Sequence, residues 1–138
     1  MFEVYQKTLS KKLSFEGVGL HSGKNSKLKL LPAEVDQGIV FKRVDLKDNK
    51  LIKANFSNVS SARLCTTLEN KKGIKVSTVE HLLAALYIKG IDNAIIEIDN
   101  EEVPIMDGSA KDFLENIKNT DIKQQSQKRK FLKILKKI

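Results

Sequence analysis

The chain of 138 residues is poor in several residue types, and each shortage excludes a class of protein. It has one cysteine, which excludes an internal disulfide framework and favours a reducing compartment. It has no apolar run long enough to span a membrane, and residues 1–6 lack the basic and then apolar order of a signal peptide. These shortages predict a cytoplasmic protein, and the length predicts one domain with a core of its own.

The net charge of +8 suggests a nucleic-acid partner, but the distribution of the charge argues against one. Residues 121–138 carry seven Lys or Arg and one Asp, whereas the rest of the chain is nearly neutral. Tryptophan is absent, and the six phenylalanines do not alternate with basic residues as they do in proteins that bind single strands. We therefore expect no nucleic-acid partner.

The apolar pattern predicts a mixture of strands and helices. Strands are expected over residues 4–15, 26–31, 38–44, 51–56, 64–68, 74–76 and 94–98, with a short return strand over 103–105. One helix is expected from about residue 78 to 89, ended by Gly90. A second helix follows Ser109, with an apolar stripe of Ala110, Phe113, Leu114 and Ile117. The predicted fold is α+β, a two-layer sandwich of a mostly antiparallel sheet with two main helices.

The stretch from Ser77 to Leu86 predicts the start of the first helix. Ser77 is a favourable N-cap residue, and Glu80 three positions later completes a capping box. An apolar stripe at helical spacing is expected to face the core: Val79, Leu82, Leu83, Leu86 and Tyr87. The opposite face carries His81, Ala84, Ala85 and Ile88. Because that face is small and apolar, we expect another surface to cover it.

Glu80 and His81 are the residues best suited to chemistry. A histidine on a helix is more often structural than a ligand, but His81 lies away from the core face and beside a carboxylate. A metal polarises water while a nearby carboxylate accepts its proton, so this pair suits metal-assisted hydrolysis. The alternative role of Glu80 is that of the capping-box acid. A catalytic zinc takes three protein ligands, and the sequence lacks H-E-x-x-H, C-x-x-C and H-x-x-x-D, so the residues alone do not complete a site.

The stretch Gly17–Gly23 predicts a turn. It differs from a dinucleotide-binding loop because Ser22 replaces the third glycine and a strand, not a helix, follows. His21 in this turn is either a surface residue or a substrate contact. Cys65 is expected to be a small buried or half-buried residue, and Asp107 a turn former.

Four segments taken together are more specific than any single residue: Gly17–Gly23, Ser77–Leu86, Gly90–Asn93 and Val103–Ala110. With them, residues 5–120 resemble the N-terminal half of the UDP-3-O-acyl-N-acetylglucosamine deacetylase family, the zinc hydrolases of lipid A biosynthesis in Gram-negative bacteria. That family has two similar α+β domains with the active site between them. The resemblance implies hydrolysis of the 2-acetamido group of UDP-3-O-acyl-N-acetylglucosamine, with release of acetate.

The resemblance also implies roles for single residues. Glu80 would be the general base that activates water, and His81 one ligand of Zn²⁺. The other implied site residues are the substrate-binding Leu20, His21 and Cys65 and the supporting Asp107. The family's other zinc ligands and catalytic residues belong to its second domain, so we expect this chain alone to be inactive and the second domain, in cis or in trans, to be its partner. Residues 1–120 would form the N-terminal domain, and residues 121–138 a basic linker with the truncated start of the second.

The last residues allow a different interpretation. Phe131, Ile134, Leu135 and Ile138 fit a helical stripe with lysines on the remaining face, which is typical of a helix that lies on an anionic membrane. The same residues are equally explained as a strand of the second domain. The alternative function is therefore a non-catalytic binding module with weak membrane-surface contact. The uncovered apolar helix face also predicts self-association.

Overall fold

The computed structural model describes residues 4–48 and 50–137 and has the predicted α+β fold. Its elements in chain order are β1 (Tyr5–Leu9), β2 (Leu13–Val18), β3 (Asn25–Pro32), β4 (Ile39–Arg43), β5 (Leu51–Lys53), the 3₁₀ helix η1 (Phe56–Asn58), β6 (Val59–Ser61), β7 (Thr67–Glu69), β8 (Lys75–Ser77), α1 (Glu80–Ile88), β9 (Ala94–Ile98), α2 (Lys111–Lys118) and β10 (Ile122–Lys128).

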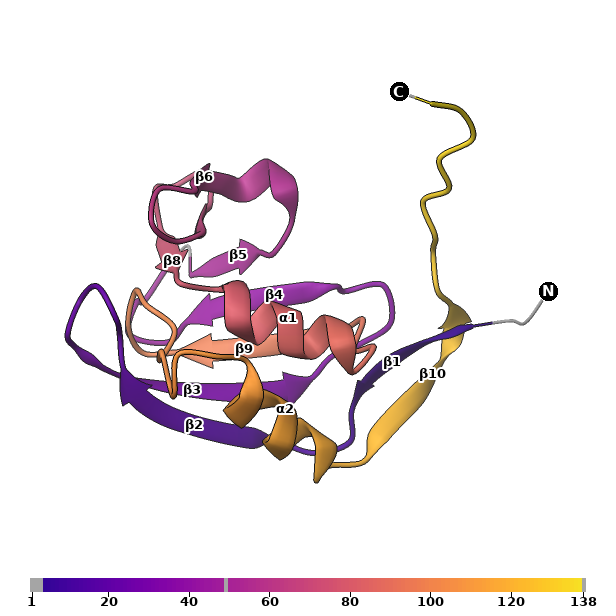
Figure 1. Ribbon diagram of the computed structural model, residues 1–138, viewed down its shortest axis with the longest axis horizontal. Coiled ribbons are helices and arrows are strands. Elements are labelled where there is room, and N and C mark those ends of the chain that lie inside the picture. The colour runs from indigo at the N-terminus through magenta and orange to yellow at the C-terminus, as the bar shows by residue number, and fades with distance from the viewer. Residues whose placement is uncertain (1–3, 49, 138) are drawn as a thin grey trace.

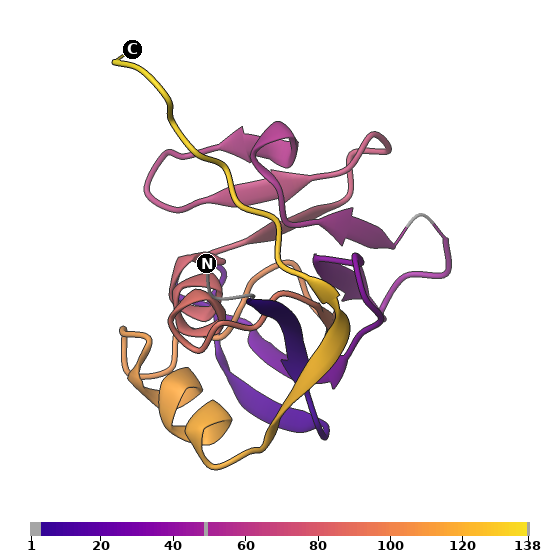
Figure 2. The ribbon, with the colours of Figure 1, turned by 90° about the vertical axis from the view of Figure 1, so that its right-hand side faces the viewer.

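The described strands form three sheets. The main sheet has the order β2-β3-β9-β4-β5, a second sheet has the order β6-β7-β8, and β1 pairs with β10. The β4–β9 pair is parallel and the other pairs are antiparallel, as the sequence predicts for most of the sheet. Both helices lie on one face of the main sheet, which gives two layers (Figure 1). Figure 2 shows the same arrangement turned by 90°, with the β1–β10 pair facing the viewer.

The core lies between the main sheet and the helices. In β3, Leu28 and Leu30 are fully buried while Lys27 and Lys29 between and beside them are exposed. The same alternation in β9 buries Ala94, Ile96 and Ile98 and leaves the intervening residues half-buried. Period-2 alternation is what places one face of a strand against a core. The inward face of this sheet is therefore continuous and apolar.

Helix α2 packs as its sequence predicts, but the stripe of α1 is rotated. Phe113 and Ile117 of α2 are fully buried. In α1, Tyr87 is 86% exposed, so its assignment to the core face was wrong, and Ala85 is fully buried instead. The buried positions 79, 82, 85 and 86 are spaced i, i+3, i+6 and i+7 and share one face, and Tyr87 lies about 100° further around the helix than Leu86. The C-terminus is as expected: Gly90 has φ +68, and its N–H donates to the carbonyl of Tyr87.

Four expected strands differ in the structure. The strand expected over residues 4–15 is two strands, because β1 pairs with β10 whereas β2 pairs with β3, and the chain changes neighbour between Ser10 and Lys12. The return strand over 103–105 does not form. Instead the N–H of Val103 donates to the carbonyl of Ser77, and the N–H of Ile105 donates to the carbonyl of Val18. Pro104 between them has no N–H to donate. The expected strands over 51–56 and 64–68 shorten to β5 and β7.

Two strands were not predicted, β6 and β10. All three residues of β6 are exposed, so their sequence carries no burial pattern. Strand β10 falls inside the segment expected to be a linker, so the first part of residues 121–138 is a paired strand of this fold. The boundary expected after residue 120 stays a prediction.

A buried network of amide side chains holds the β1–β10 pair to the rest of the fold. Asn93, 1% exposed, donates 2.8 Å hydrogen bonds to the side-chain oxygens of Gln6 and Gln125. The amide of Gln125 in turn donates to the carbonyl of Ala33, and Oδ1 of Asn93 accepts from the N–H of Gly38. Buried polar groups that are all paired specify one arrangement of the segments that carry them. The network therefore fixes β1 and β10 against the edge of the sheet.

The segment after β10 extends away from the rest of the fold (Figures 1 and 2). Within residues 129–137 the structure has no helix, so the predicted amphipathic helix is wrong there; Ile138 lies outside the described residues. The apolar side chains of this segment are exposed: Phe131, Leu132, Ile134 and Leu135. Among the described residues, neither helix has the length and apolarity that crossing a membrane requires.

Candidate active site

A bend in the backbone places Glu80 and His81. Strand β8 ends at Ser77, and α1 begins only at Glu80, later than the sequence predicts. Between them Thr78 has φ +56, a conformation that is rare for a β-branched residue and needs support from its surroundings. That support is a 2.8 Å hydrogen bond from the Thr78 hydroxyl to Oε1 of Glu102. The bend turns the chain from β8 into the first turn of α1.

The capping box predicted at this helix does not form. The N-cap residue is Val79, without a side-chain hydrogen bond, and the Ser77 hydroxyl donates instead to the carbonyl of Glu101. The carboxylate of Glu80 accepts a hydrogen bond from the backbone N–H of Thr66. Glu80 is thus tied to the loop before β7 and is not the capping-box acid.

That hydrogen bond brings two predicted site segments together. Cys65 precedes Thr66 in the chain, is half-buried, and has its Sγ 3.9 Å from Oγ1 of Thr67. His81, next to Glu80 in the first turn of α1, is also half-buried. The structure therefore places a carboxylate, an imidazole and the Cys65–Thr66 segment at one end of α1. Their catalytic and binding roles stay proposals.

The glycine-rich turn lies between β2 and β3 and carries two further predicted residues. The N–H of Gly19 donates to the carbonyl of Lys24, and the N–H of Gly23 donates to the carbonyl of Gly19. These two hydrogen bonds close the loop. Leu20 is 61% exposed and His21 is exposed, so both side chains are accessible to a ligand. The backbone N–H groups of His21 and Ser22 donate to Glu102 over 3.0 and 2.7 Å.

Glu102 is the site residue that sequence reasoning missed. Glu102 is only 2% exposed. Its carboxylate accepts hydrogen bonds from backbone N–H groups of the glycine loop and from the hydroxyl of Thr78. Burial by itself raises the pKa of the carboxyl, but the hydrogen bonds from His21, Ser22 and Thr78 outweigh it and lower the pKa from 4.5 to about 2. In the sequence Glu102 ends the polar run 99–102, which resembles a solvent-exposed turn, and nothing there signals burial.

We expect this buried carboxylate to make the fold sensitive to acid. Because the folded-state pKa lies below the unfolded value, the stabilisation is complete above about pH 4.5 and is lost as the pH falls towards about 2. At about 1.4 kcal/mol per pKa unit, the contribution is at most about 3.5 kcal/mol. Urea unfolding of the wild type and Glu102→Gln at roughly pH 6 and roughly pH 3 measures it. The stability difference between the two proteins should shrink at the lower pH, and a constant difference would contradict the assignment.

Asp107 lies in the turn before α2. Its Oδ1 accepts from the N–H of Ser109 at 2.9 Å and from the Ser109 hydroxyl at 2.8 Å, and these hydrogen bonds lower the pKa of Asp107. The Ser109 hydroxyl oxygen in turn accepts from the N–H of Lys111, the first residue of α2. In this structure Asp107 orders the start of α2. Its expected support of the site stays a prediction.

The donor set for a metal is incomplete in the part of the chain that the structure describes. There, no group of three or more His, Cys, Asp or Glu residues is placed to hold a metal ion. His81 fits one ligand position, because it is a half-buried imidazole adjacent to the Glu80 carboxylate at a helix end. The residues described here therefore fit a share of a zinc site and not a whole one.

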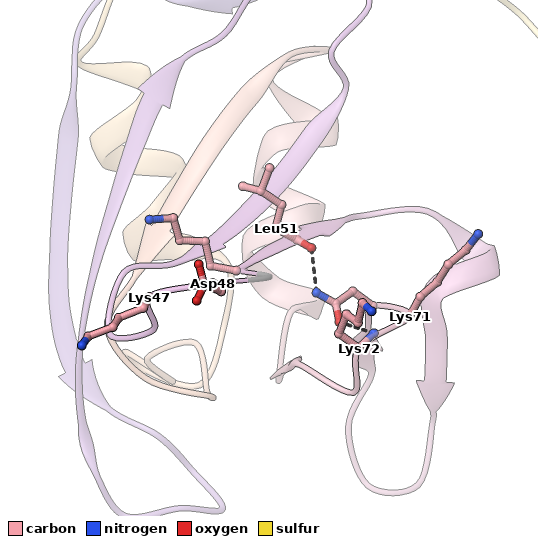
Figure 3. Close-up of a pocket in the computed structure, with 7 residues that line it drawn as sticks. Lys47, Asp48, Leu51, Lys71 and Lys72 are labelled. Atoms are coloured by element: carbon pink, nitrogen blue, oxygen red, sulfur yellow. Dashed lines mark hydrogen bonds between the residues drawn. The ribbon is translucent and has the colours of Figure 1, made fainter.

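Two surface pockets lie away from Glu80 and His81. One, of about 540 Å³, lies beside β5 and is lined by Lys47, Asp48, Lys50, Leu51, Asn70, Lys71 and Lys72. Figure 3 shows the side chains of Lys47 and Lys71 pointing to opposite sides, so these amines do not converge on one ligand. The amide of Asn70 donates to the carbonyl of Leu51 at 3.0 Å, which ties the two loops. The second, of about 710 Å³, lies between the end of α1 and the segment after β10.

The side of α1 that faces away from the sheet is uncovered and largely apolar. Ala84 and Ile88 are exposed, as expected for that face, whereas Ala85, expected there too, is buried and Tyr87 is exposed instead. His81 lies between this face and the core and is half-buried. The site end of α1 thus continues directly into an apolar surface that lacks a partner among the described residues.

Glu80 and His81 in the first turn of α1, the glycine-rich turn and the uncovered apolar face of α1 together define the candidate site. The sequence model of the UDP-3-O-acyl N-acetylglycosamine deacetylase (LpxC) family matches residues 6–138, and the chain belongs to this family.

Individual relatives agree with the family. The chain is 50% identical over 134 residues to a UDP-3-O-acyl-N-acetylglucosamine deacetylase of Geotalea uraniireducens, covering 97% of this chain and 43% of the relative. It is 47% identical over 135 residues to the protein of the same name from Shewanella frigidimarina, covering 98% of this chain and 44% of the relative. The chain thus spans less than half the length of these curated relatives.

Proposed function

We propose that this chain supplies one half of the active site of a zinc-dependent deacetylase. The substrate would be UDP-3-O-acyl-N-acetylglucosamine, whose 2-acetamido group is hydrolysed to acetate and a free amine in lipid A biosynthesis. The observation that carries the proposal is the placement of Glu80 and His81 in the first turn of α1, beside the Cys65–Thr66 segment and next to the uncovered face of the helix. Membership in the deacetylase family supports the reaction class.

Each predicted residue has a role that its environment permits. Glu80 is the general base: its carboxylate accepts the N–H of Thr66 through Oε1 and would take a proton from the attacking water. His81 is one zinc ligand, and zinc, when bound, polarises the amide carbonyl and lowers the pKa of water. Leu20 and His21, on the exposed glycine loop, and the half-buried Cys65 contact the substrate. Asp107 supports the site through the turn that it orders.

The partner of this site is a second catalytic domain, in cis or in trans. It would supply the remaining zinc ligands and cover the apolar face of α1 that is uncovered here. Without it the described residues do not complete a metal site, so we propose that the chain alone is inactive.

Complementation tests this function. The chain, mixed in the presence of Zn²⁺ with the part of the Geotalea uraniireducens relative that it does not match, should release acetate from the substrate, whereas neither part alone should. The reason is that each part holds only a share of the zinc ligands and catalytic residues. Acetate release is measured by a coupled assay, and co-elution on a sizing column shows whether the parts associate. A folded, associated pair that releases no acetate would refute the proposal.

Membrane contact by the segment after β10 stays a second proposal. Its basic residues and four exposed apolar side chains support it, but the helix that would segregate them is absent from residues 129–137. Self-association through the apolar face of α1 and this segment likewise stays a prediction.

A further inference from the structure

Glu102 joins two segments that lie far apart in the sequence. Its Oε1 accepts from the N–H of His21 at 3.0 Å and from the hydroxyl of Thr78 at 2.8 Å, and its Oε2 accepts from the N–H of Ser22 at 2.7 Å. One carboxylate thus holds the glycine loop and the bend that leads into α1. Hydrogen bonds to an ionised acceptor are the stronger ones, and here the acceptor is nearly inaccessible to water.

The loop is shaped to receive this carboxylate. Gly19 has no positive φ, so its backbone conformation does not require glycine. A Cβ at this position would lie 2.4 Å from Oε2 of Glu102 and 2.4 Å from the hydroxyl of Ser22. The absence of a side chain at Gly19 is therefore explained by the space that the carboxylate occupies.

The connection matters because the two segments carry different parts of the proposed site. The loop presents Leu20 and His21, which are exposed, and the bend is followed directly by Glu80 and His81. The bend also contains the unfavourable φ of Thr78, which the Glu102 hydrogen bond stabilises. A change at Glu102 would free the loop to move relative to α1, although Glu102 itself is buried.

We propose that Glu102 is a positioning residue that fixes the substrate-binding loop Gly19–Gly23 relative to the start of α1. The proposal rests on the proposed function for the roles of the loop and of α1, but the connection itself can be measured in the chain alone. Because Glu102 acts through the loop, its loss should weaken substrate binding more than it slows the chemical step.

The first measurement is amide hydrogen exchange by NMR on the chain alone, comparing the wild type with Glu102→Gln. Glutamine presents an NH₂ group where one carboxylate oxygen accepts, so at least one loop N–H loses its acceptor. The amides of His21 and Ser22 should exchange about tenfold faster or more, while those of β3 and β9 keep their protection. Protection retained at His21 and Ser22 would overturn the proposal.

Two further variants separate the connection from charge and folding. Glu101→Gln removes the same charge from the neighbouring residue, whose side chain is 70% exposed, and should leave loop exchange unchanged. Gly19→Ala keeps the charge of Glu102 but places a methyl group against the carboxylate, and it should speed exchange at His21 and Ser22 as Glu102→Gln does. Faster exchange in Glu101→Gln, or none in Gly19→Ala, would overturn the proposal.

The second measurement uses the complemented pair. Glu102→Gln should raise KM about tenfold and change kcat by no more than about threefold, because the loop contributes substrate binding that is equal in the ground and transition states. An unchanged KM, or a fall in kcat alone, would overturn the positioning role. If the wild-type pair releases no acetate, the proposed function fails, and the exchange measurement still decides whether Glu102 holds the loop.

Discussion

In the complemented pair, Glu80→Gln is expected to lower kcat by a factor of about 10² to 10⁴, the usual contribution of a general base. Glutamine has nearly the same shape and keeps a carbonyl oxygen that accepts the N–H of Thr66, so the loop before β7 should stay in place. What is lost is the ability to accept a proton from water. Steady-state rates of acetate release measure the effect.

The matched control is Glu115→Gln, on the exposed side of α2, which should leave kcat unchanged. The zinc content of the complemented Glu80→Gln pair should equal that of the wild type, since Glu80 is not proposed as a ligand. A Glu80→Gln pair with wild-type kcat would exclude Glu80 as the base. A loss of zinc in this variant would assign Glu80 to the metal instead.

The largest expected effect on stability is that of Phe113→Ala. Phe113 is fully buried in α2, and its ring packs against that of Phe15 in β2 with centroids 5.0 Å apart and planes inclined by 59°. Truncating a buried phenylalanine costs about 3–5 kcal/mol, because apolar contact is lost and a cavity remains. Domains are stable by only about 5–15 kcal/mol, so this one change removes a large share. Urea unfolding followed by circular dichroism gives the free energy of unfolding.

Phe56→Ala provides the comparison, because Phe56 in η1 is 92% exposed. It should change the free energy of unfolding by no more than about 0.5 kcal/mol. Equal effects of the two substitutions would mean that the contact between α2 and the sheet is not what stabilises this layer.

The parts of the fold that the sequence predicts well are those with one buried face. Lys and Leu alternate over residues 27–30 of β3, β9 is a short run rich in Ile, and α2 has an apolar stripe, so the type of each element follows from its sequence. Strand β6 is exposed throughout and β10 is mostly polar, so pairing alone makes them strands. Strand β10 pairs with β1, near the other end of the described residues, and such pairing leaves no local signal; β6 pairs with the nearby β7 but has no buried face that would mark it.

The same reasoning explains what the sequence could say about the candidate site. Glu80 and His81 stand out because a carboxylate beside a histidine suits known chemistry, and the glycine loop because glycine is informative about turns. Glu102 does not stand out, because its importance depends on Thr78 and on backbone N–H groups of the loop, which are brought to it by tertiary structure. The capping-box prediction failed for a related reason: Thr66, distant from Glu80 in the sequence, donates to its carboxylate.

The β1–β10 pair has a consequence for the order of folding. Gln6 and the carbonyl of Lys128, which it contacts, are 122 positions apart, so their pairing closes nearly the longest loop the chain can form. Closing such a loop in an unfolded chain costs about 4 kcal/mol beyond a constant, which two isolated strands do not recover. Once the main sheet and helices have formed, most of that distance is already bridged, and Asn93 is in place between Gln6 and Gln125. We therefore expect the β1–β10 pair to form late in folding, so that β1 gains its neighbouring strand only after the rest of the domain has formed.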